Sequence, residues 1–75
     1  MEFDRECDAS GLLCPLPILR TKKTLAGMAR GEVLRVVATD AGLLRDMPTL
    51  VRKTGDVLLL QAHEDKKIVF YLRKA

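Results

Sequence analysis

Apolar and polar residues alternate in four short segments of the chain, which is the pattern of strands that bury one face. These segments cover residues 3–8, 32–39, 56–63 and 66–74. Two polar residues, Glu64 and Asp65, separate the last two segments, so we expect these two strands to form a hairpin.

The same alternation predicts which side chains of the strands are buried. In the first strand Cys7 shares a face with Phe3 and Arg5, and we interpret this cysteine as a small core residue. The side chains expected to face the helices in the later strands are Leu34, Val36, Ala38, Ile68, Phe70 and Leu72. The opposite, open face of the sheet would carry four apolar side chains among charges, namely Val33, Val37, Val69 and Tyr71. Such a face is either ordinary exposed surface or a surface that binds a partner.

Apolar residues at spacings of three and four predict a helix over residues 15–29, and Gly31 is expected to stop it. The stripe that this helix would bury consists of Ile18, Thr21, Leu25 and Met28.

A second stripe predicts a helix that ends near Thr54, with Gly55 as its stop and Asp40 available as a cap. The stripe consists of Leu43, Met47, Leu50 and Val51. Pro48 lies within it and leaves two starts open, because proline disrupts a helix interior. Either the helix begins at Pro48, with Asp46 or Met47 as its cap, or residues 41–47 form a looser first turn.

The resulting order is βαβαββ, in one domain over residues 1–75. The first two strands, joined by a helix, should be parallel with a right-handed crossover. Two helices can cover only one face of the sheet. We therefore predict an α/β (α+β) two-layer sandwich, with a four-stranded mixed sheet and both helices on one face.

Composition and charge narrow the possible functions. The net charge of +3 comes from basic residues interspersed with acidic ones, and the chain has only three aromatic residues, which disfavours direct nucleic-acid binding. Two cysteines and one histidine without a C-x-x-C spacing do not suggest a zinc site. No stretch approaches the ~20 apolar residues of a membrane span, and residues 1–6 do not resemble a signal peptide. We therefore expect a cytoplasmic protein that does not bind membranes.

The stretch most suggestive of chemistry is a cysteine followed by two prolines at alternate positions, Gly11-Leu12-Leu13-Cys14-Pro15-Leu16-Pro17. We interpret it as a strand-to-helix turn with Cys14 as N-cap and Pro15 as the first helical residue. A Cys14 thiolate would then receive the Leu16 N–H and the positive end of the helix dipole. Gly11 would give the preceding turn its conformational freedom.

These residues resemble the TusA-like (SirA-like) sulfur-carrier family. The resemblance begins at Asp8, includes Gly11 and the Cys-Pro-x-Pro motif, and continues through Lys23 and Gly31 to Arg45-Asp46-Met47-Pro48. It implies that Cys14 carries sulfane sulfur as a persulfide. The motif residues Gly11, Pro15, Leu16 and Pro17 would support the helix start, and the candidate partner contacts are Asp8, Lys23, Arg45 and Asp46.

The resemblance also implies a sulfurtransferase that acts with partner proteins. A donor such as a cysteine desulfurase or a rhodanese would load the carrier, and an acceptor protein would receive the sulfur. The pathway would be tRNA thiolation or cytoplasmic oxidation of reduced sulfur compounds. No cofactor or metal is expected beyond the covalent sulfur, and we expect a monomer. The alternative is a thiol-bearing interaction or regulatory module without sulfur turnover.

Overall fold

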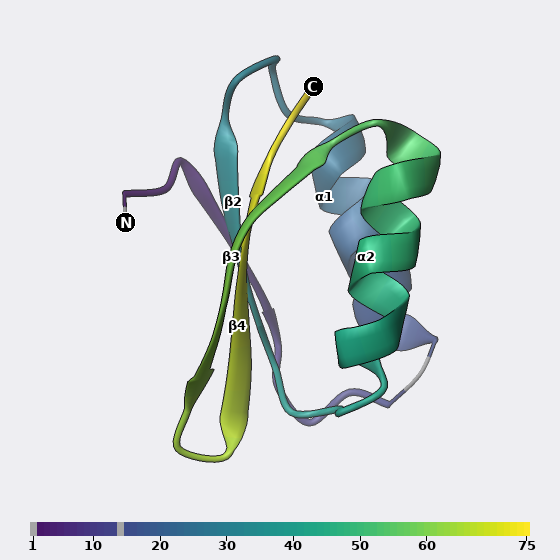
Figure 1. Cartoon of the computed structure of the whole chain (residues 1–75), viewed down its shortest axis with the longest axis vertical. Helices are drawn as coiled ribbons and strands as arrows, with labels where there is room; N and C mark the ends of the chain where they lie inside the picture. Colours follow the sequence, from purple (N-terminus) through teal and green to yellow (C-terminus); the bar gives the residue numbers. More distant parts are fainter. Residues whose placement is uncertain (1, 14) are drawn as a thin grey trace.

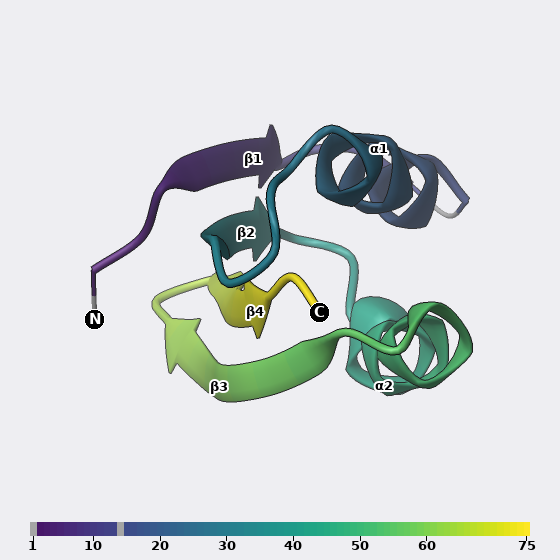
Figure 2. The same ribbon diagram turned by 90° about the horizontal axis from the view of Figure 1, so that it is seen from above.

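The computed structural model describes residues 2–13 and 15–75, so the predictions for Cys14 lie outside the described residues. The elements are β1 (Arg5–Ala9), α1 (Leu16–Ala26), β2 (Val33–Ala38), α2 (Leu43–Thr54), β3 (Val57–Glu64) and β4 (Lys67–Arg73). Figures 1 and 2 show both helices on one face of a twisted sheet. The predicted two-layer sandwich with the order βαβαββ is confirmed.

The sheet has the strand order β1-β2-β4-β3. β1 pairs with β2 in parallel, with Cys7 opposite Val36. β4 pairs antiparallel with both β2 and β3. The β3–β4 link is Asp65-Lys66 rather than Glu64-Asp65, because Glu64 still pairs with Lys67 and Asp65 takes a left-handed φ of 60°. Aspartate tolerates that conformation, which suits it to a two-residue hairpin turn.

The core lies between the sheet and the two helices, as the alternation predicts. Cys7 belongs to it, with 7% of its surface exposed. The strand residues that are completely shielded from solvent are Ala9, Leu34, Val36, Ala38, Phe70 and Leu72. From the helices, Leu25, Leu43, Met47, Leu50 and Val51 pack against them. Burial of this apolar surface is the main stabilising term of the fold.

The open face of the sheet is less apolar than expected, because Val37 and Val69 are buried. Its centre carries Arg35, which forms an ion pair with Glu6 and donates from Nε to the Tyr71 hydroxyl at 3.2 Å. These contacts raise the pKa of Arg35, mainly through the hydrogen bond to Tyr71. The four apolar side chains therefore do not form the exposed patch expected from the alternation.

Phe3 also departs from its predicted place on the face of Cys7. β1 begins only at Arg5, and the Phe3 ring lies 6.3 Å from that of Tyr71, measured between centroids. The guanidinium carbon of Arg35 lies 5.7 Å from the Phe3 ring centre, within the range of a cation–π contact. Phe3 precedes β1, so the alternation of the strand does not fix the side to which its ring points. The contacts with Tyr71 and Arg35 place the ring on the open face.

The first helix is shorter than predicted at both ends. It begins at Leu16, and Pro15 precedes it with φ −98° and ψ 11°. It ends at Ala26, where the Gly27 N–H donates to the Thr24 carbonyl and the Met28 N–H to the Leu25 carbonyl, both at 3.1 Å. Gly31 is not the stop: with φ 88°, it lies in the turn before β2 and donates its N–H to the Lys74 carbonyl.

The second helix begins before Pro48 and contains it. Gly42 precedes the first helical residue, and Asp40 bonds to the Gly42 N–H at 2.9 Å rather than capping the helix itself. Pro48 has no N–H to donate to the Leu44 carbonyl, but tertiary packing of the apolar stripe keeps the helix continuous. Gly55 ends it in the left-handed conformation, as predicted.

Candidate functional site

The loop that leads from β1 to the Cys-Pro-x-Pro motif is anchored at two points. An Asp8 carboxylate oxygen accepts the Ser10 N–H at 3.0 Å, and this hydrogen bond lowers the pKa of Asp8. Gly11 donates its N–H to the Thr39 hydroxyl at the end of β2, at 2.8 Å. Gly11 has a φ of 78°, where a side chain would be strained. Asp8 and Gly11 therefore set the path of the chain toward the motif.

The Leu16 N–H donates to the Leu13 carbonyl at 2.9 Å. The predicted donation to a Cys14 thiolate lies outside the described residues. The short-range bond from Leu16 to Leu13 places Pro15 in a turn ahead of the helix rather than in its first position. The Pro15 carbonyl accepts the first helical bond, from Leu19 at 3.1 Å. Pro17 is the second residue of the helix and is buried. Its lack of an N–H costs nothing there, because the N–H groups of the first helical turn have no partner within the helix.

Large apolar side chains surround the motif without being buried. Leu13 is 73% exposed, Leu16 50% and Leu19 54%. Leu16 and Leu19 are three residues apart on α1 and so occupy one side of the helix. Exposed apolar residues grouped at one place, unlike isolated ones, indicate a surface that another molecule covers.

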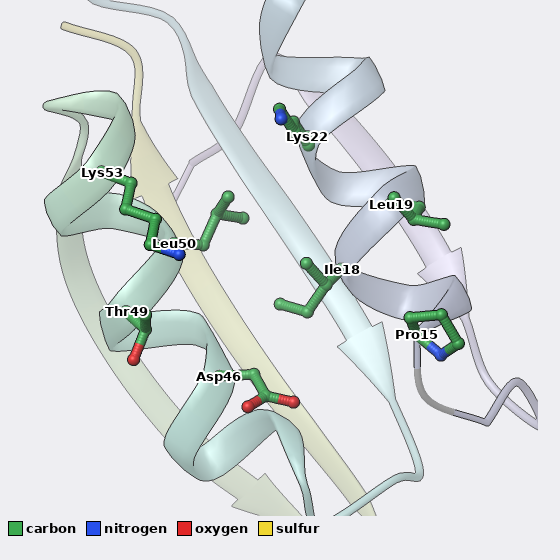
Figure 3. Close-up of a pocket in the computed structure, with 8 residues that line it drawn as sticks. All are labelled: Pro15, Ile18, Leu19, Lys22, Asp46, Thr49, Leu50 and Lys53. Carbon is green, nitrogen blue, oxygen red and sulfur yellow. The ribbon is translucent and has the colours of Figure 1, made fainter.

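A groove of about 320 Å³ runs between α1 and α2, beginning at Pro15. Figure 3 shows its lining: Pro15, Ile18, Leu19 and Lys22 from the α1 side, and Asp46, Thr49, Leu50 and Lys53 from α2. Ile18 and Leu50 lie between the two helices, with Lys22 toward one end and Asp46 toward the other. The Lys53 side chain runs along the groove, and its nitrogen lies beside Leu50. The motif therefore opens onto a partly apolar groove.

The predicted partner-contact residues are only partly brought together. Asp46 and Pro15 line the same groove, and Arg45 lies beside Asp46, with 3.4 Å between Nε and a carboxylate oxygen. The Arg45 side chain is 85% exposed. Lys23 is exposed on α1 but does not line the groove, and Asp8 lies in the loop before the motif.

The groove lysines, Lys22 and Lys53, were not predicted from the sequence. Lys53 lies seven residues after Asp46, and Lys22 lies seven residues after Pro15, so each pair is separated by about two helical turns. That equal spacing is a signal in the sequence, but it becomes informative only when α1 and α2 are known to be neighbours.

The second thiol, Cys7, lies in the core rather than at the motif. Burial raises its pKa, and hydrogen bonding to Thr24 only partly opposes this effect. Cys7 is therefore a neutral thiol at pH 7, which is the unreactive form. The prediction that it serves as a small core residue is confirmed.

We expect Cys7→Ser to lower the free energy of unfolding by about 1–3 kcal/mol, because a more polar hydroxyl is buried in the core, where only the threonine side chains beside it can replace its hydrogen bonds to water. Cys7→Ala serves as the control without a new polar group. The pKa of Cys7 is raised in the folded protein, so its neutral thiol also contributes stability that depends on pH. This contribution is fully present at pH values below the pKa of the cysteine in the unfolded chain and is lost as the pH rises through its pKa in the folded protein. Urea denaturation at neutral and alkaline pH measures both effects. Equal stability of the original protein, Cys7→Ser and Cys7→Ala would contradict the assignment of Cys7 to the core.

Residues 2–13 and 15–75 contain no cluster of three or more His, Cys, Asp or Glu side chains that could hold a metal ion. Neither helix within these ranges is long and apolar enough to cross a membrane.

Comparison with known proteins agrees with this arrangement. Residues 5–74 match the family described as sulfurtransferase TusA. The sulfur carrier protein TusA of Allochromatium vinosum is 49% identical over 74 residues, which cover 99% of this chain and 97% of that protein. The sulfur carrier protein TusA of Pseudomonas entomophila is 38% identical over 71 residues, covering 95% and 89% of the two chains.

A solved structure shows the same fold. The crystal structure of the SirA-like protein from Desulfitobacterium hafniense superposes with a TM-score of 0.80, covering 96% of this chain and 97% of that one. Its 23% identity supports the fold alone. The family match and the two closely aligned relatives extend over nearly the whole sequence, and the chain belongs to the TusA sulfurtransferase family of sulfur carriers.

Proposed function

We propose that this protein is a sulfur carrier that holds sulfane sulfur as a persulfide on Cys14 and passes it to an acceptor protein. The observation that carries the proposal is the exposure of Leu13, Pro15 and Leu16, the residues flanking Cys14 in the chain. A sulfur carrier must present its thiol to the active sites of other proteins, and an exposed apolar segment provides a surface for such contacts.

The chemistry is a pair of thiol–persulfide exchanges. In the first, the Cys14 thiolate attacks the outer sulfur of a donor persulfide; a new S–S bond forms on Cys14, and the donor leaves as a thiolate. In the second, an acceptor thiolate attacks the outer sulfur now on Cys14, and Cys14 leaves as a thiolate. Each exchange conserves the number of S–S bonds, so it needs no cofactor, metal or external oxidant.

The proposed donor is a cysteine desulfurase or a rhodanese, and the proposed acceptor belongs to tRNA thiolation or to oxidation of reduced sulfur compounds. The reducing cytoplasm suits this chemistry because it keeps an unloaded thiol free. We propose that the chain acts there as a monomer and depends on its partners for turnover.

The proposal is tested by supplying isotopically labelled sulfur through each donor class. The chain is incubated with a cysteine desulfurase and cysteine, or with a rhodanese and thiosulfate labelled in its outer sulfur. We expect one of these donors to transfer label to the chain, and dithiothreitol to release it. If neither donor labels the folded protein, the carrier function is wrong and the interaction-module alternative replaces it.

A further inference from the structure

The groove between α1 and α2 has a polarity along its length. Figure 3 shows Pro15 and Asp46 toward one end and Lys22 toward the other. Lys53 reaches from the Lys22 end along the groove until its nitrogen lies beside Leu50. Asp46 and Lys53 are seven residues apart on α2, and Lys22 is six residues after the first residue of α1. Each spacing corresponds to about 10 Å along its helix. The groove is thus about two helical turns long, with its motif end and its lysine end on opposite sides of an apolar centre.

The lysine end is suited to carboxylates. Within the part of the chain that the structure describes, neither Lys22 nor Lys53 takes part in an ion pair. One comes from each helix, so together they place two positive charges on either side of the same opening. At the motif end Asp46 has Arg45 beside it, and its negative charge disfavours another carboxylate there.

The centre of the groove is suited to an apolar side chain. Ile18 is half-buried, Leu50 is buried, and Leu19 on the rim is 54% exposed. Leu16, one turn before Leu19, extends this apolar surface outside the groove. A small anionic thiol would leave that extension uncovered, whereas a protein segment would cover it.

We propose that this groove docks a segment of a sulfur-transfer partner in which an apolar side chain has carboxylates beside it in the sequence. The apolar side chain lies over Ile18 and Leu50, and the carboxylates meet Lys22 and Lys53. This proposal rests on the proposed function, because the docked segment would lead the partner's sulfur atom toward the motif end. The charge pattern sets the direction in which the segment lies and so its register beside the Cys-Pro-x-Pro motif.

The test uses nuclear magnetic resonance of the isotopically labelled full chain, titrated with a synthetic peptide that contains leucine followed by two aspartates. We expect the backbone amide signals of Ile18, Lys22, Thr49 and Lys53 to shift. Two control peptides, with lysine in place of aspartate or serine in place of leucine, should bind at least about tenfold more weakly. Equal shifts with all three peptides would overturn the proposal.

Three variants locate the binding. The double substitution Lys22→Glu and Lys53→Glu should weaken binding of the acidic peptide by about tenfold or more, because attraction becomes repulsion at both positions. Lys23→Glu changes the charge of an exposed neighbour outside the groove and should leave most of the affinity. Thr49→Tyr fills the groove without adding charge and should also block binding. Equal weakening by Lys23→Glu would mean general charge attraction and would overturn the proposal.

The same spectra show whether each variant is folded, and the substituted lysines are exposed, so we expect the fold to be retained. Peptide binding does not need the thiol, and Cys14→Ser protein should give the same shifts. A protein that binds the peptide but never accepts sulfur would contradict the proposed function alone. A protein that relays sulfur equally well with and without the two groove lysines would contradict the groove proposal alone.

Discussion

Cys14→Ser is expected to abolish sulfur transfer while the protein stays folded. A serine hydroxyl cannot form a persulfide and at neutral pH is a far weaker nucleophile than a thiolate. The substitution exchanges one sulfur atom for one oxygen atom, and serine is favoured at helix starts, so we expect the fold to be kept. After incubation with polysulfide and removal of the excess, cyanide should release thiocyanate from the original protein and almost none from Cys14→Ser.

The matched control for this experiment is Cys7→Ser, which removes the other thiol of the chain. Because Cys7 is buried and its pKa is raised, its loss should leave the yield of thiocyanate nearly unchanged in protein that is folded. If Cys14→Ser and Cys7→Ser reduce the yield equally, Cys7 takes part in the chemistry as a second, resolving thiol. That result would require a different mechanism.

Phe70→Ala is expected to have the largest effect on stability. Phe70 is fully buried on β4, which pairs with both neighbouring strands of the sheet. Truncation of a core phenylalanine costs about 3–5 kcal/mol. A chain of 75 residues has a total stability of only about 4–11 kcal/mol at 0.05–0.15 kcal/mol per residue, so much of it would be lost.

Phe3→Ala is the matched control for Phe70→Ala. Phe3 is 45% exposed and contacts Tyr71 on the open face, so its truncation should cost no more than about 1.5 kcal/mol. Thermal unfolding followed by circular dichroism compares the two variants. Similar melting temperatures for both would mean that the core between sheet and helices does not dominate the stability of this fold.

The fold was predictable because each strand must bury one face, and the pattern of apolar residues shows which one. Leu34, Val36 and Ala38 share one face of β2 and Arg35 lies on the other, so a shift of one residue would expose all three and turn Arg35 toward the core. The helix ends were less predictable. Gly27 and Gly31 both lie after the apolar stripe of α1, and only the tertiary contacts of the β2 turn show that the first of them ends the helix.

Pro48 shows why local preference was insufficient for the second helix. Proline disfavours the helix interior, but Leu43 and Met47 are fully buried on the same stripe, and their packing outweighs the missing hydrogen bond. Phe3 shows the converse. Its alternation with Arg5 and Cys7 predicts the core face, but β1 begins only at Arg5, and the Phe3 ring lies near Arg35 and Tyr71 instead.

One part of the candidate site could be predicted from the sequence and another part could not. The Cys-Pro-x-Pro motif is local in sequence and could be found there, as could its glycine, Gly11. The groove is not local: Lys22 and Lys53 lie on different helices, and their proximity depends on how α1 packs beside α2. Lys23, one of the four expected partner contacts, does not line the groove, whereas the adjacent residue Lys22 does.

The most direct test of the carrier mechanism is to locate the sulfur. The protein is incubated with polysulfide at pH 7, freed of excess reagent, and digested without reductant for peptide mass spectrometry. We predict mass increases in steps of about 32 Da, one sulfur atom each, on the peptide that contains Cys14, and an unmodified Cys7. Sulfur found on Cys7, or an unmodified Cys14 in the folded protein, would contradict the proposal that Cys14 carries the persulfide.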